Sequence, residues 1–257
     1  MAISGAFLRF CVDIPMNQED FAHEAIVIRN IEQFGLSIML IDGTDYLPAC
    51  AYTVGLFETF KHPELITFGL SASTLQEVLN VGGEFVKQGQ VLRPETVYPD
   101  FFEGVDATMV RVDPRNVPDY FGYAIWYHKT IEFPCLQLVW TDRRGRYPWE
   151  AGFDKHLQAL QPLLDRNADF KFKEPRDRTV FTTRQHLDQH KPILRVVHDR
   201  DGDWLFLTGD QRPEDGRAIR LDDLISRDDS LNELFSLDYG EWAERAGRDS
   251  PWVRGGV

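Results

Sequence analysis

Residues 36–70 read LSIMLIDGTDYLPACAYTVGLFETFKHPELITFGL, and they decide the fold of the first part of the chain. The apolar run 36–41 ends at Asp42-Gly43, a pair typical of tight turns. Residues 49–56 and 65–70 are two further strand-like runs, joined by a loop that carries His62-Pro63. Short apolar runs separated by turn residues predict a sheet rich in hairpins.

The segments around this sheet predict helices and two more strands. Residues 21–34 place apolar side chains at helical spacing and end at Gly35, and residues 73–86 repeat the pattern with Ser73 as the capping residue. Further strands are predicted at 107–112 and 134–141, and the aromatic-rich segment 120–128 between them favours a helix.

A charged stretch at 165–178, poor in large apolar residues, predicts a linker between two domains. We therefore expect an α+β protein with an N-terminal domain at 1–170 and a C-terminal domain at 171–257. The first is expected to hold a mostly antiparallel sheet, or a split-barrel-like one, with packed helices. The second is expected to be a small α+β domain.

The composition restricts the class of protein. The 257 residues include 41 Asp and Glu against 28 Lys and Arg, a net charge of -13. Such a chain repels nucleic acids and anionic membranes, and it suits solubility or a basic protein partner such as a toxin. Three widely spaced cysteines, Cys11, Cys50 and Cys135, favour buried thiols in a reducing compartment. With no signal peptide or transmembrane run expected, the sequence predicts a cytoplasmic protein.

Several separated motifs resemble one bacterial family. They are Tyr52-Thr53-Val54-Gly55-Leu56 with His62-Pro63-Glu64-Leu65, then Ala124-Ile125-Trp126-Tyr127, Gln137-Leu138-Val139-Trp140 and Tyr147-Pro148-Trp149-Glu150. Over residues 20–165 the chain resembles domain of unknown function 4262 through these motifs. The resemblance implies no particular reaction, because that family carries no settled activity.

A second resemblance concerns the last part of the chain. The run 203–210 (DWLFLTGD), the run 221–224 (LDDL) and the run 228–231 (DDSL) are similar to domain of unknown function 2185, grouped with immunity-protein 33-like domains of toxin systems. The likeness covers residues 193–250 and departs from the pattern at the charged insertion 211–216. It implies a protein-binding or toxin-neutralising function.

Polar side chains among large aromatics predict a small-molecule pocket in the first domain. His62 is the candidate acid–base group, oriented by Glu64 or Glu150, while Arg146 would hold an anion; His128 is a further catalytic candidate. The candidate ligand-binding residues are Tyr52, Thr53, Trp126, Tyr127, Trp140, Arg146, Trp149 and Glu150. The alternative is that the aromatics form core and the polar groups satisfy buried backbone, and this alternative is slightly favoured.

No motif predicts a metal site or a nucleotide loop. His62-Pro63-Glu64 with Pro134-Cys135 contains only part of the zinc deaminase signature, because Leu138 stands where the second cysteine is needed. The order of strands and helix in 37–112 is compatible with a flavin-binding split barrel, which makes flavin the one cofactor considered. No cofactor is otherwise expected.

Two functions remain, with the first favoured. In one, the protein is an immunity-type module that binds a basic partner through Asp199, Asp201, Asp203, Asp222, Asp223, Asp228 and Asp229. In the other, the first domain binds or converts a small molecule. A free acidic face would support the first function, and convergence of the aromatic and polar residues on one cleft would support the second. The oligomeric state is not predicted.

Overall fold

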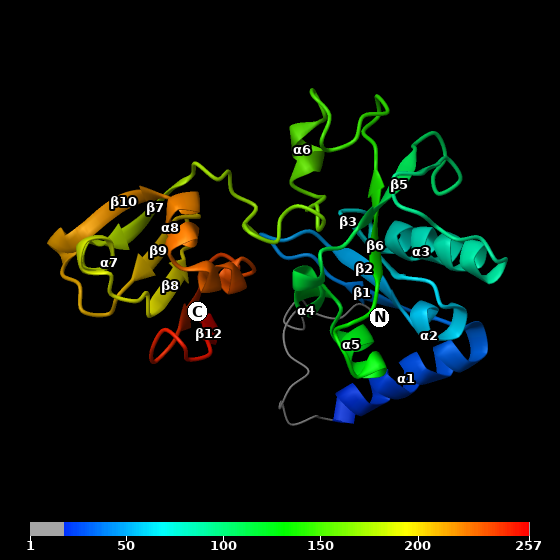
Figure 1. The fold of residues 1–257 in the computed structure, drawn as a ribbon, viewed down its shortest axis with the longest axis horizontal. Helices are drawn as coiled ribbons and strands as arrows, with labels where there is room; N and C mark the ends of the chain where they lie inside the picture. The colour runs from blue at the N-terminus through cyan, green and yellow to red at the C-terminus, as the bar shows by residue number, and fades with distance from the viewer. Residues whose placement is uncertain (1–17, 257) are drawn as a thin grey trace. The chain divides into compact units, whose positions relative to one another are not determined.

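The computed structural model describes residues 18–256, which form two compact units. The first unit contains the described residues up to Thr44 and Pro48–Ala168, and the second contains Asp45–Leu47 and the chain from Asp169 onward. Each unit is built on its own six-stranded sheet with helices beside it (Figure 1). The α+β class predicted from the sequence is confirmed.

The first sheet is open and mostly antiparallel, so it follows the first of the two predicted architectures rather than a closed barrel. Only β3 and β6 run parallel. In spatial order the strands are β1 (Ser37–Ile41), β2 (Cys50–Val54), β3 (Glu64–Phe68), β6 (Cys135–Trp140), β5 (Ala107–Arg111) and β4 (Val97–Tyr98). Every residue of β2, β3 and β6 is buried, as the continuous apolar runs require.

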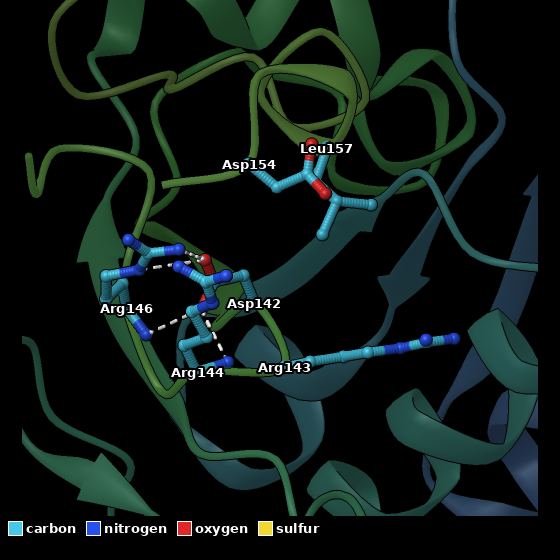
Figure 2. Close-up of a pocket in the computed structure, with 6 residues that line it drawn as sticks. All are labelled: Asp142, Arg143, Arg144, Arg146, Asp154 and Leu157. Carbon is cyan, nitrogen blue, oxygen red and sulfur yellow. Dashed lines mark hydrogen bonds and ion pairs between the residues drawn. The ribbon is translucent and has the colours of Figure 1, made fainter. Parts of the chain in front are cut away.

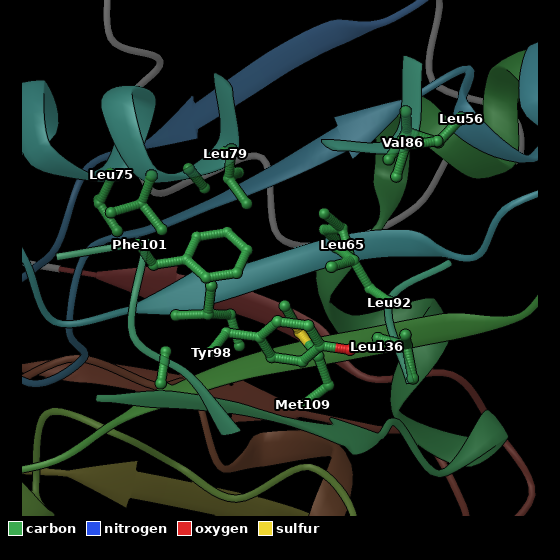
Figure 3. Packing of buried hydrophobic residues seen from close by; sticks show 14 of the residues in the cluster. Leu56, Leu65, Leu75, Leu79, Val86, Leu92, Tyr98, Phe101, Met109 and Leu136 are labelled. Atoms are coloured by element: carbon green, nitrogen blue, oxygen red, sulfur yellow. The ribbon is translucent and has the colours of Figure 1, made fainter. Parts of the chain in front are cut away.

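Helix α3 (Ala72–Lys87) packs on one face of this sheet. Its N-terminus is capped by Ser71 and not by the predicted Ser73, because the Ser71 hydroxyl accepts a hydrogen bond from the Thr74 N–H and Ser73 lies inside the helix. Leu75 and Leu79 point from the helix toward the ring of Phe101 in a core that includes Leu65, Met109 and Leu136 (Figure 3). The spacing of apolar residues that predicted this helix therefore marks the face that it buries.

Short helices connect the strands. Tyr120 and Phe121 contact Phe68 and Tyr52 on the sheet, and the Tyr52 hydroxyl accepts a hydrogen bond from the Tyr123 N–H. The aromatic segment 120–128 is thus helical as predicted, but it is broken into two short helices. The helical elements of the unit besides α3 are α1 (Gln18–Phe34), α2 (Leu56–Phe60), the 3₁₀ turn Pro114–Asn116, α4 (Val117–Tyr120), α5 (Gly122–His128) and α6 (Lys155–Gln158).

The second unit is another mixed sheet in which only β7 and β9 run parallel. Its strands, in spatial order, are β10 (Gly216–Arg220), β7 (Thr179–Thr183), β9 (Trp204–Leu207), β8 (Arg195–His198), β11 (Glu241–Glu244) and β12 (Val253–Gly256). Its helices are α7 (Arg184–Gln189) and α8 (Leu221–Arg227), with 3₁₀ turns at Pro213–Asp215 and Asp229–Leu234. No helix among residues 18–256 is long and apolar enough to cross a membrane.

An aromatic cluster forms part of the core of the second unit. The His198 ring stacks on Trp204 with 4.1 Å between centroids, and Tyr46 packs edge-on against both rings. The Tyr46 hydroxyl donates a 2.6 Å hydrogen bond to Glu174, which also accepts from the Trp204 indole N–H. Residue 46 therefore belongs structurally with residues more than a hundred positions later.

A buried ion pair organises the other side of the second unit. The Arg245 guanidinium lies 2.6 Å from the Asp228 carboxylate, and the two side chains are 1% and 4% exposed. Arg245 also donates hydrogen bonds to the Ile193 carbonyl and the Ser230 hydroxyl, and its guanidinium lies over the Trp252 ring. These partners come from separate segments of the unit, so one side chain connects them.

Replacing Arg245 by alanine should destabilise the second unit by about 3–5 kcal/mol, because Asp228 would remain buried without its partner. The matched control is Arg195→Ala, which removes the exposed pair with Glu244 and should cost at most about 1 kcal/mol. Urea unfolding, combined with amide hydrogen exchange of β8 and β11, measures the loss of stability in both variants. Equal losses in the two variants would refute the organising role of Arg245.

Candidate functional site

The residues predicted to form one pocket lie toward opposite ends of β6. Glu64 pairs with Cys135, the first residue of this strand, whereas Arg146 follows Trp140, its last residue, after a short turn. The five steps from Cys135 to Trp140, at about 3.3 Å each, put the two ends of the strand roughly 17 Å apart. The first end carries Thr53, Glu64 and His128, and the second carries Arg146 and the residues after it.

At the first end, the Glu64 carboxylate is fully buried and accepts four hydrogen bonds. The Thr53 hydroxyl donates at 2.6 Å to one oxygen. The other oxygen receives the backbone N–H groups of Gly55 and Phe57, at 2.9 and 3.1 Å, and lies 2.9 Å from His128 Nε2. These donors satisfy a charge that would otherwise be costly to bury. The arrangement joins β2, β3, α2 and α5.

His62 has no ring nitrogen left for proton transfer. Its Nδ1 lies 2.8 Å from the Pro63 carbonyl, and its Nε2 accepts a 3.1 Å hydrogen bond from the Leu92 N–H. Burial lowers the pKa of His62, which keeps the ring neutral. This geometry favours a structural role for His62. Its side chain connects the segment just before β3 to the loop at residue 92.

The aromatic residues at this end pack mainly on one another. His128 contacts the rings of Phe57, Tyr127 and Phe133, and Lys129 lies over the Trp126 ring at 4.9 Å. Burial, followed by the negative charges of Glu58, Glu64 and Glu32, raises the pKa of Tyr127. Trp126 and Tyr127 remain half-buried, so these contacts do not decide between a pocket and a core.

At the second end, the chain turns around the carboxylate of Asp142. One Asp142 oxygen accepts the backbone N–H groups of Arg144 and Arg146, at 2.8 and 3.0 Å. The other accepts the Arg146 guanidinium through Nε at 3.0 Å and Nη2 at 2.7 Å. Burial disfavours the charged carboxylate, but the hydrogen bonds from Arg146 and Arg144 outweigh it and lower the pKa of Asp142 to about 2.

This turn forms one wall of a cavity of about 500 Å³ lined by Asp142, Arg143, Arg144, Arg146, Asp154 and Leu157. Asp154 and Leu157 lie across from Arg144 and Arg146, while Arg143 extends away from the Asp142–Arg146 pair (Figure 2). Within the described part of the chain, the guanidinium groups of Arg143 and Arg144 have no hydrogen bond or salt bridge. Both side chains are exposed, so their charges face solvent.

Of the residues predicted to bind a ligand, only Arg146 lines this cavity. Trp140 is buried in the core and donates its indole N–H to the Phe68 carbonyl at 3.0 Å. Trp149 stacks on Tyr147 and lies under the Arg166 guanidinium, and Glu150 accepts the Tyr147 N–H. Sequence reasoning missed Arg143 and Arg144, although the run Arg143-Arg144-Gly145-Arg146 after a strand is a visible signal in an acidic chain.

The carboxylates predicted to bind a basic partner are partly engaged within the second unit. Asp228 pairs with Arg245, Asp222 with Arg220, and Asp203 with Arg178 at 3.4 Å. Asp199 accepts the backbone N–H groups of Asp201 and Asp203 in its own turn. The side chains of Asp201, Asp223 and Asp229 are exposed, and no hydrogen bond or salt bridge holds them among the residues described.

The cysteines of the described chain are inert in their present surroundings. Cys50 and Cys135 are buried and free, and burial raises the pKa of Cys50 to about 12. Cys11 lies outside the described residues. Residues 18–256 contain no group of three His, Cys, Asp or Glu side chains placed to hold a metal ion. The flavin hypothesis stays a prediction.

Replacing Glu64 by glutamine should destabilise the first unit by about 1–3 kcal/mol, because an amide group would face donors that now bond a carboxylate. Glu77→Gln on the exposed face of α3 is the control and should change stability by less than about 0.5 kcal/mol. Urea unfolding, monitored by circular dichroism, compares the stabilities of the two variants. A Glu64→Gln protein as stable as the control would show that this carboxylate does not hold the elements together.

Three histidines should make the protein less stable in mild acid. Burial is the largest cause that lowers the pKa of His62, His186 and His198 below their ordinary value of 6.5. The unfolded chain therefore takes up protons first, so stability is complete above about pH 6.5 and decreases as the pH falls below it.

The measurement is the urea midpoint between pH 7.5 and 5.5, where Asp142 stays ionised. His198→Phe should reduce the slope of stability against pH, whereas His156→Gln at an exposed position should not. A midpoint that does not change with pH in the wild-type protein would contradict the expectation.

Comparison with known proteins reaches the first unit only. Residues 30–154, from near the C-terminal end of α1 to the residue before α6, match the family model described as Domain of unknown function (DUF4262). No curated protein and no solved structure matches the chain. The match does not include residues 193–250, whose likeness to immunity-protein 33-like domains stays a prediction. Residues 30–154 of the first unit are therefore similar to the DUF4262 family, and they include the sheet that holds both polar ends.

Proposed function

We propose that the first unit binds a small organic anion in the cavity beside the turn 142–146. The observation that carries this proposal is the pair of guanidinium groups, Arg143 and Arg144, that lack a carboxylate partner among the described residues. The chain has an excess of acidic residues, yet three arginines fall within four consecutive positions at one cavity. Planar guanidinium groups match carboxylate and phosphate oxygens in charge and geometry.

The surroundings support ligand binding. A volume of about 500 Å³ accommodates a small metabolite. The cavity follows the C-terminal end of β6, where the chain leaves the sheet and turns around Asp142. Arg146 contributes by neutralising Asp142, which fixes the turn and removes a negative charge from the wall.

Local backbone geometry preserves this arrangement. Gly145 has φ +72°, a conformation that side chains disfavour, and it allows the turn to close around Asp142. A Cβ at Gly152 would lie 2.6 Å from Arg146 Nη1, so glycine leaves room for the guanidinium. The backbone of the turn and the Arg146 side chain are therefore fixed before a ligand arrives, whereas the exposed Arg143 and Arg144 side chains are ordered on binding.

The double variant Arg143→Ala/Arg144→Ala should bind inorganic phosphate at least about tenfold more weakly, because each charge-assisted hydrogen bond contributes about 1.5–3 kcal/mol. The matched control is Arg93→Ala/Arg111→Ala, which removes two exposed arginines that do not line the cavity. Calorimetric titration at low ionic strength measures both proteins. Undiminished binding by the first variant, or an equal loss in the control, would refute the proposal.

Binding of a basic protein partner, as the sequence predicted, is the second candidate function. Its support is the exposed set Asp201, Asp223 and Asp229, together with the net charge. The other four carboxylates already have partners or cap their own turn, which leaves less negative charge for an interface. We favour the anion site because its two free cations share one cavity.

A further inference from the structure

The cavity wall opposite the arginines carries a negative charge. Asp154 lies across the cavity from Arg144 and Arg146, and Leu157 beside it is the apolar member of the lining (Figure 2). One Asp154 oxygen accepts the His156 N–H at 2.9 Å and caps α6. The second oxygen has no hydrogen bond or salt bridge within the described residues. The carboxylate is thus fixed in place with one acceptor free.

The free charges of the cavity are therefore two cations on one wall and one anion on the other. The Asp142–Arg146 pair contributes no net charge, because each group neutralises the other. An ionised carboxylate is only an acceptor, so it repels a second anion and needs a hydroxyl or ammonium donor. A ligand that is negative throughout would satisfy the arginines and be repelled by Asp154.

We infer that the preferred ligand is a phosphorylated amine, with its ammonium on Asp154 and its phosphate on Arg144 and on Arg143, whose exposed side chain turns inward to reach it. This inference rests on the proposed anion site. A phosphate dianion matches two guanidinium charges, and an ammonium matches the single carboxylate, so the three charges are neutralised together. Leu157 is the one apolar lining residue, which suits a short polar body better than a long hydrocarbon or an aromatic ring.

A matched pair of sugar phosphates tests this inference on the full chain. Glucosamine 6-phosphate and glucose 6-phosphate differ by one ammonium in place of one hydroxyl. At pH 7 and low ionic strength we expect the amine to bind roughly tenfold more tightly, as one charge-assisted hydrogen bond allows. Asp154→Asn should remove this preference while both ligands still bind, because asparagine keeps the helix cap. Asp100→Asn, an exposed position outside the lining, is the control and should retain the preference.

The outcomes separate the inference from the proposed function. Equal affinities for the two ligands, both lost in Arg143→Ala/Arg144→Ala, would overturn the phosphorylated amine and leave the anion site standing. A preference that persists in Asp154→Asn would also overturn it, since the ammonium would then contact another group. Failure of both ligands and of inorganic phosphate to bind would overturn the anion site itself.

Discussion

The buried carboxylate of Glu64 is the constraint on which the first unit depends. A charge removed from water must be surrounded by donors, and here the donors come from β2, from the start of α2 and from α5. The position of each element is thereby tied to one point. Gly55 shows how strict this is, because the residue that donates its N–H to Glu64 has φ +105°, which side chains disfavour, and an added Cβ would lie 2.9 Å from Ile31.

This constraint explains the first motif through which the sequence resembles the DUF4262 family. Thr53, Gly55, His62 and Glu64 all take part in hydrogen bonds that hold chain segments together. Polar residues grouped in a motif are often interpreted as an active site, but here each has a partner within the fold. Arg143 and Arg144, which line the cavity and have no partner among the described residues, lie beyond the C-terminal end of β6. They are outside this motif.

The secondary structure of the first unit could be predicted from sequence, since apolar runs and turn residues act locally. The strands near 37–41, 50–54 and 64–68 and the helix ending at Gly35 follow from such signals. The site could not be predicted in the same way. Whether an arginine is free depends on its neighbours in space, and among the described residues Asp142 binds Arg146 but leaves Arg143 and Arg144 unpaired. The spacing Asp142 to Arg146 is the one local clue to that pair. The engagement of Asp228 with Arg245 likewise joins segments 17 residues apart.

The place of Tyr46 in the second unit has a consequence for how the protein is made. Its ring is packed against His198 and Trp204, which leave the ribosome long after it. At synthesis rates of about 5–20 residues per second, the tyrosine waits roughly 10–30 s for these partners. During that interval the hairpin loop between β1 and β2 carries an uncovered aromatic side chain. Genetic recombination that transfers only the C-terminal segment would therefore not transfer the complete second unit. One of the core residues of this unit, Tyr46, is encoded near the beginning of the gene.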